Sequence, residues 1–234
     1  MIKKQINQND ILHSEFLNIL DYPYLFNNKP LRRAKTKPEI EDTLEKLKLL
    51  KLKIQNIKDC NLKNNASKIV FSDGNVSSPI MIIGEGPGQK EDEIGKPFVG
   101  DAGNLLNKML KAINIERNKI YITNVVNYQP PNNRKPEKIE INRYSDFLKE
   151  HISIINPKII ILMGSTAMEA IFGNNIKISK ERGKWKETII KQKTYRTFIT
   201  FHPAYLLRQP EQKKYSWIDL KILRKKIDEL NINI

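Results

Sequence analysis

Three polar side chains occur where they could act together on a flat, polar ring. Glu85 directly follows the apolar segment IMIIG, and its carboxylate could position a water molecule or stabilise a developing positive charge. Asn124 lies in the apolar stretch YITNVV, and its amide presents a donor beside an acceptor, which complements the edge of a pyrimidine. His202, in FHPAYLLRQP, could donate a hydrogen bond to an oxygen that gains negative charge as a bond breaks. A solvated glutamate and an asparagine bonded to nearby backbone are the structural alternatives.

Glycines alternate beside Glu85 in the run GEGPG. Their spacing matches neither the dinucleotide-binding fingerprint nor the Walker loop, which argues against a phosphate cradle. Together with Pro87 they form a turn with little side-chain cover, so a flat ligand could approach the main chain closely. A purely structural turn is the alternative. Glu91, a second carboxylate near this turn, could react or could shape the motif.

Phe98 lies in GKPFVG, between Pro97 and Gly100. These neighbours constrain the backbone, and the ring could stack on a base there. Because phenylalanine is often buried, a place in the core is the alternative.

Strands and helices that alternate along the chain would position these residues. Short apolar segments rich in β-branched residues predict strands at 80–84, 120–126, 158–164 and 194–203. Helical spacing of apolar residues predicts helices near 40–54, 101–113, 137–154, 165–172 and 213–230. This order predicts an α/β fold, a three-layer α/β/α sandwich with a central, mainly parallel four-stranded sheet. Ligands bind such sheets outside the carboxyl ends of the strands, where the candidate residues fall.

The expected organisation is an N-terminal extension at 1–56, which carries a lysine-rich helix, followed by a main domain at 57–234. No apolar run reaches about eighteen residues and no signal-like segment follows the first residues, so we expect an intracellular protein. The single cysteine, Cys60, cannot form an intramolecular disulfide or a four-cysteine metal site by itself.

The composition is strongly basic. Forty-one Lys and Arg residues against 26 Asp and Glu give a net charge of +15. Such an excess favours a polyanionic partner and speeds its encounter with the protein. The alternative explanation of the basic charge is a genome whose composition raises the lysine content of all its proteins.

Four separated blocks resemble the uracil-DNA glycosylase superfamily, specifically the family 4 enzymes of bacteria and archaea. The blocks are GEGPGQKEDEIGKPFVGDAGNLLNKML, YITNVVNYQPPNNRKP, LMGSTAMEAIFG with RGKW, and FHPAYLLRQP. They span about residues 57–210. The resemblance implies an enzyme that flips a uracil nucleotide out of DNA, hydrolyses its N-glycosidic bond and leaves an abasic site.

The resemblance also implies a role for each matching position. Gly86 would line the uracil pocket, Phe98 would stack on the base, and Asn124 would read its Watson–Crick edge. Glu85 would orient the hydrolytic water or stabilise the oxocarbenium-like sugar, and His202 would stabilise charge on the uracil 2-carbonyl. Glu91 is expected in the catalytic set or as a residue that shapes the motif.

The segment after His202 is implied to contact DNA. It begins with Pro203, which forces a turn, and ends with Arg208, expected at a phosphate. Leu206 or Leu207 would fill the gap left by the flipped base. An apolar helix start is the alternative for the two leucines.

Family 4 enzymes usually hold a four-iron cluster through four cysteines. At the corresponding positions this chain has Ile57, Cys60, Tyr128 and Tyr144. Because thiolates hold such a cluster, we expect no iron–sulfur cluster and no other metal, with apolar and aromatic packing in its place. The pocket residues are all present, so activity need not be lost.

The sequence thus predicts a monofunctional uracil-DNA glycosylase of base excision repair. We expect a monomer that acts on uracil-containing DNA in the bacterial cytosol at the nucleoid, without membrane contact. A sister branch that bonds covalently to uracil-DNA carries a reactive histidine after the second block, and QPPNNRKPEKIEI has none. The alternatives are a non-catalytic nucleic-acid-binding module on the same fold and an enzyme on free nucleotides.

Overall fold

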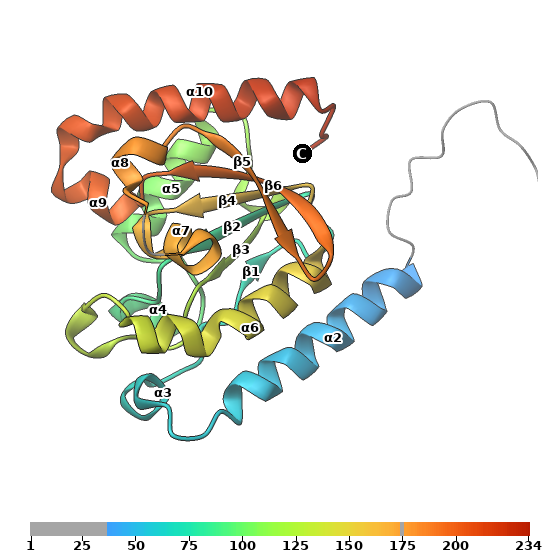
Figure 1. The fold of residues 1–234 in the computed structure, drawn as a ribbon, viewed down its shortest axis with the longest axis vertical. Helices are drawn as coiled ribbons and strands as arrows, with labels where there is room; N and C mark the ends of the chain where they lie inside the picture. The colour runs from blue at the N-terminus through green and yellow to red at the C-terminus, as the bar shows by residue number, and fades with distance from the viewer. Residues whose placement is uncertain (1–36, 174–175) are drawn as a thin grey trace, which may run out of the picture. The chain divides into compact units, whose positions relative to one another are not determined.

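A computed structural model describes residues 37–173 and 176–234. Its centre is one sheet with the strand order β1-β3-β2-β4-β6-β5 (Figure 1). The strands are β1 (Asp73–Gly74), β2 (Ile80–Gly84), β3 (Tyr121–Asn124), β4 (Ile159–Met163), β5 (Trp185–Ile190) and β6 (Lys193–Thr200). The four inner strands are parallel, and β1 and β5 pair antiparallel at the two edges.

All four predicted strands are present, but the described sheet has six strands rather than four. The first missed strand, β1, is only two residues long and carries no pattern. The second, β5, forms a hairpin with β6 through Lys191 and Gln192, whose φ angles are 45° and 65°. Asn or Gly usually marks such a two-residue turn, and neither is present here to signal it.

The helices of the described residues cover the sheet. They are α2 (Lys37–Gln55), α3 (Asn61–Asn65), α4 (Gln89–Ile94), α5 (Asp101–Lys111), α6 (Lys138–Ile155), α7 (Ser165–Phe172), α8 (Ile178–Glu181), α9 (Pro203–Arg208) and α10 (Lys213–Glu229). Short 3₁₀ turns lie at Arg117–Lys119, Pro131–Asn133 and Pro210–Gln212. The five predicted helices correspond to α2, α5, α6, α7 and α10.

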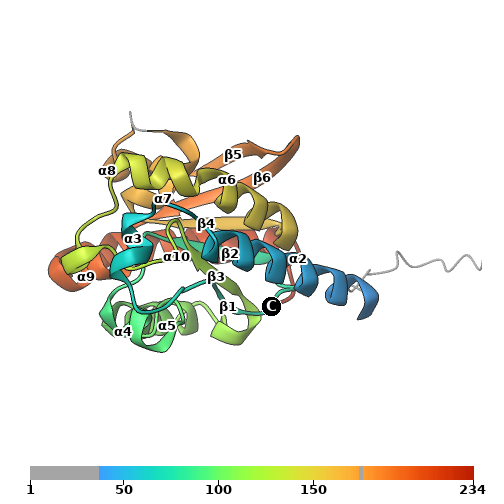
Figure 2. The ribbon, with the colours of Figure 1, turned by 90° about the horizontal axis from the view of Figure 1, so that it is seen from below.

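Two hydrophobic cores lie on the two faces of the sheet. Met81 and Ile83 of β2 belong to the core that includes α2, α6 and α7, whereas Ile80 and Ile82 belong to the core that includes α5 and α10. This alternation is the period-two pattern of a strand buried on both faces. Figure 1 shows α6 and α10 on opposite sides of the sheet, and Figure 2 shows the same for α5 and α6. The three-layer α/β/α sandwich is confirmed.

Helix α2 packs into the first of these cores. Its residues Leu47, Leu50 and Ile54 are buried there, and Lys53 forms an ion pair with Glu150 of α6 at 2.7 Å. Residues Lys37–Ile234 form one compact unit. The division at 56/57 stays a prediction, and residues 1–36 of the predicted extension lie outside the described residues. None of the described helices is long and apolar enough to cross a membrane.

Candidate active site

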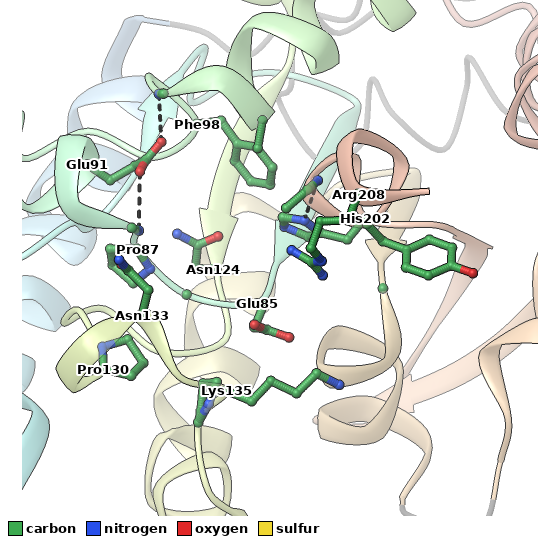
Figure 3. A pocket seen from close by; sticks show the side chains of 18 of the residues that line it. Glu85, Pro87, Glu91, Phe98, Asn124, Pro130, Asn133, Lys135, His202 and Arg208 are labelled. Atoms are coloured by element: carbon green, nitrogen blue, oxygen red, sulfur yellow. Dashed lines mark hydrogen bonds between the residues drawn. The ribbon is translucent and has the colours of Figure 1, made fainter. Parts of the chain in front are cut away.

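The carboxyl ends of β2, β3, β4 and β6 meet at a cavity of about 930 Å³. Strand order reverses beside β2, because β3 lies on one side of it and β4 on the other. Open parallel sheets bind ligands at such a switch point. The structure brings Glu85, Phe98, Asn124 and His202 together around this one space (Figure 3).

Asn124 is 3% exposed at the end of β3. Its Oδ1 is buried and has no hydrogen-bond partner within the described part of the chain. The register of the sheet places Gly84 beside Asn124. A Cβ on Gly84 would lie 2.4 Å from this Oδ1 and 2.5 Å from Cζ of Phe98, so only glycine leaves room for both side chains. Because buried polar atoms normally have a partner, this oxygen is suited to accept a hydrogen bond from a ligand.

Phe98 adopts a φ of 53°, which is unusual for a bulky residue. Arg117 holds this turn, because its guanidinium donates to the carbonyl oxygens of Phe98 at 3.0 Å and Pro97 at 2.7 Å. An ion pair with Asp73 at 2.9 Å fixes Arg117 in turn. The Phe98 ring stacks on His202, with 5.4 Å between centroids and 29° between planes. The ring is thus fixed at the edge of the cavity.

His202 is the N-cap of α9, and its Nδ1 accepts a hydrogen bond from the backbone N–H of Ala204 at 3.1 Å. In the neutral ring the proton must then lie on Nε2. Burial, together with the smaller effect of the positive charges of Arg208 and Lys135, lowers the pKa of His202 to about 4. Near pH 7 the imidazole is therefore a neutral Nε2–H donor.

Glu85 is half-buried at the cavity. Its Oε2 accepts a hydrogen bond from the hydroxyl of Thr166, near the start of α7. Gly86 follows, and a Cβ there would lie 2.8 Å from Cγ2 of Val126. The absence of a side chain thus lets the segment after β2 run close to the segment after β3.

The carboxylate of Glu91 is occupied by backbone groups. Oε1 accepts from the N–H groups of Val99 at 2.9 Å and Gly100 at 2.8 Å, and Oε2 accepts from Gly88 at 3.2 Å. Figure 3 shows Glu91 apart from the carboxylate of Glu85, on the side of Pro87. These bonds tie the glycine turn to the turn that carries Phe98.

The segment after His202 presents only part of itself to solvent. Pro203 is buried at the start of α9, and Leu206 is 1% exposed in the core with α5 and α10. Leu207 is 43% exposed, and Arg208 lines the cavity. Of the two leucines considered as a wedge, Leu207 is the accessible one.

Comparison with known proteins places this geometry in a family. A family model of the uracil DNA glycosylase superfamily matches residues 71–224. The chain belongs to this superfamily. It is 42% identical to the type-4 uracil-DNA glycosylase of Sulfurisphaera tokodaii, over 78% of this chain and 84% of that protein. It is 39% identical to the type-4 uracil-DNA glycosylase of Thermotoga maritima, over 70% of this chain and 84% of that protein. It is 35% identical to that of Archaeoglobus fulgidus, over 80% of this chain and 94% of that protein.

The pocket of this superfamily member includes residues that the sequence did not single out. Lys135 lines the cavity, and its ammonium donates to Oγ of Ser165 at 2.8 Å. Gly164 has a φ of 91° and packs against His202, and Thr166 contacts Glu85. The glycine and hydroxyl residues directly after a buried strand, in LMGSTAM, were the available signal for this turn.

The four positions that correspond to the cluster cysteines of family 4 lie in the same core. Sγ of Cys60 lies 3.5 Å from Oη of Tyr144, and Ile57 packs against the cluster of buried residues that holds both. Burial, and then the bond to Cys60, raises the pKa of Tyr144 far above its usual range; burial and Cys60 also raise that of Tyr128. One thiol and two phenols do not fit the donor set of an iron–sulfur cluster. No group of three potential metal-ligating side chains occurs among the described residues.

Proposed function

We propose that the chain is a monofunctional uracil-DNA glycosylase of base excision repair, which hydrolyses the N-glycosidic bond of deoxyuridine in DNA and leaves an abasic site. The observation that carries this proposal is the buried Oδ1 of Asn124, which has no hydrogen-bond partner among the described residues and belongs to the cavity that Phe98 and His202 also line. A base that offers a donor beside an acceptor would satisfy this amide.

Uracil offers that pattern. Its N3–H would donate to Oδ1 of Asn124, and its O4 would accept from Nδ2. In cytosine, N3 is an acceptor and would face the acceptor Oδ1 of Asn124, and the 4-amino donor would face the donor Nδ2. Neither hydrogen bond could form. Phe98 would stack on the ring and Gly86 would allow close approach of the backbone. The edge of the base thus distinguishes uracil from cytosine, whereas thymine, which has the same edge, would have to be excluded at its 5-methyl group.

Hydrolysis would proceed as the bond from C1′ to N1 breaks and the electron pair leaves with uracil. The neutral His202 would donate from Nε2 to the 2-carbonyl oxygen, where negative charge develops. Glu85 would stabilise the positive charge on the sugar and orient the water that attacks C1′. As the bond from C1′ to oxygen forms, this water gives up a proton, and the released uracil anion takes up a proton to become neutral uracil. For Glu91 we propose a positioning part, through its three backbone bonds.

DNA would approach over Lys135, Leu207 and Arg208. Lys135 and Arg208 both line the cavity. Neither forms an ion pair within the described part of the chain, so both charged groups would be available to phosphates. Leu207 would fill the gap left by the flipped base, with Pro203 and the buried Leu206 holding α9 in place.

We further propose that the enzyme works as a monomer in the cytosol at the nucleoid, and that residues 57–234 carry the activity. It would do so without an iron–sulfur cluster, since only Cys60 of the four ligands remains. Iron and sulfide analysis of protein purified without oxygen tests this point. Iron below about a tenth of an equivalent is expected, and near-stoichiometric iron would contradict it.

The activity itself is tested with a uracil-containing oligonucleotide, treated with enzyme and then with alkali. Strand cleavage at the uracil is expected, and matched thymine and cytosine oligonucleotides should stay intact. Binding of the uracil oligonucleotide without cleavage would favour the non-catalytic module instead.

A further inference from the structure

Three consecutive residues, Gly164 directly after β4 and the first two residues of α7, contact three functional groups. A Cβ on Gly164 would lie 2.9 Å from Cβ of His202, so the glycine allows these segments to touch. Ser165 accepts from the ammonium of Lys135 at 2.8 Å. The hydroxyl of Thr166 donates a hydrogen bond to Oε2 of Glu85. One short segment of the chain therefore contacts Glu85, His202 and Lys135.

Thr166 is fixed more firmly than a surface threonine. The residue is 2% exposed and lies in the first turn of α7, the helix that follows β4, one of the two central strands of the sheet. Being β-branched, it is restricted at χ1 within a helix. Within the described residues its hydroxyl is the one hydrogen-bond partner of the Glu85 carboxylate.

A half-buried carboxylate on a flexible side chain would otherwise sample several orientations. A donor that holds Oε2 leaves Oε1 as the oxygen to accept a hydrogen bond from water. Misplacement of a reacting group by about 1 Å can cost on the order of a hundredfold in rate. The hydroxyl thus has a role that its methyl group cannot supply.

We propose that Thr166 is a positioning residue for hydrolysis: its hydroxyl holds the Glu85 carboxylate so that one oxygen faces the cavity and the attacking water. This inference rests on the proposed function, because it concerns the part that Glu85 takes in uracil excision. A purely structural role would require only that the volume of Thr166 be filled.

Thr166→Val tests the proposal, because it keeps the shape and removes the donor. Single-turnover excision at saturating enzyme is expected to slow by roughly ten- to a hundredfold, while the Kd for uracil-DNA stays within about threefold. Thr166→Ser should restore the rate to within about threefold of the wild type. Thr197→Val is the matched control, since Thr197 is a fully buried threonine of β6 that does not line the cavity.

Glu85→Gln and the double variant complete the experiment. If Thr166 acts through Glu85, adding Thr166→Val to Glu85→Gln should slow excision by less than about threefold. A full additional loss in the double variant, or an unchanged rate in Thr166→Val, would overturn the positioning role. If Glu85→Gln alone leaves excision intact, the proposed use of Glu85 fails instead. Should Thr166→Val unfold, failure of Thr166→Ser to support excision would equally overturn the proposal.

Discussion

Replacement of Asn124 by alanine should abolish most uracil excision and leave DNA affinity nearly unchanged. The amide is 3% exposed, and its Oδ1 has no partner within the described residues. In the variant, uracil would enter the cavity with its N3–H and O4 both unsatisfied. The protein's contacts to phosphates would remain, because they come from other residues.

The magnitude follows from two lost hydrogen bonds. Each buried polar group left without a partner costs about 1–3 kcal/mol, so two give about 2–6 kcal/mol. In the wild type, Oδ1 of Asn124 has no hydrogen bond within the described residues that must break when uracil binds. We therefore expect a loss near the middle of this range, about 4 kcal/mol. At about 1.4 kcal/mol per factor of ten, excision should slow roughly a thousandfold.

The assay is single-turnover excision with alkali cleavage, with Kd measured separately by fluorescence anisotropy. Asn127→Ala is the matched control: Asn127 is also 3% exposed, but its amide donates to the backbone oxygen of Val70 at 3.1 Å. This control should lose stability and keep its rate per folded molecule within about threefold. A loss of less than tenfold in Asn124→Ala, or an equal loss in the control, would refute the assignment.

Three further results are expected. Gly84→Ala should slow excision roughly a hundredfold or more with the fold intact by circular dichroism, because its Cβ would lie 2.4 Å from Oδ1 of Asn124; wild-type rates would contradict this. Arg208→Ala should raise the Kd for DNA and reduce its salt dependence while excision at saturation stays within about threefold, and the reverse pattern would argue against a phosphate contact. The free energy of unfolding should fall as the pH drops below 6.5, since burial lowers the folded pKa of His151 to about 3 and that of His202 to about 4, so that the unfolded chain binds the protons first. Urea titrations at pH 7 and pH 4.5 measure this loss, and equal stabilities would count against it.

The four parallel strands and the place of the site could be predicted because their signals are local. β2 and β4 are short apolar runs, and β3 and β6 are rich in β-branched and aromatic residues. Glu85, Asn124 and His202 each follow or end one of these strands. Parallel strands bring their carboxyl ends to one edge, so residues far apart in sequence had to meet. The family motifs then supplied the role expected for each residue.

What could not be predicted depends on tertiary contacts. The choice between Leu206 and Leu207 is decided by how α9 lies on the core, which the helical pattern of six residues does not define. The partners of Glu91 are backbone N–H groups that only the folded turns bring within reach. Thr166 likewise lies beside Glu85 only because β4 pairs with β2 in the folded sheet.

We propose that this chain excises uracil catalytically although three of the four cluster cysteines of family 4 are replaced. The direct measurement is the amount of free uracil released from excess uracil-DNA, determined on a protein sample whose iron content has been measured. We expect many uracil molecules per enzyme molecule at negligible iron, each matched by one alkali-labile site. Release that occurs only in iron-containing protein, or DNA binding without release, would show that the proposal of catalysis without the cluster is wrong.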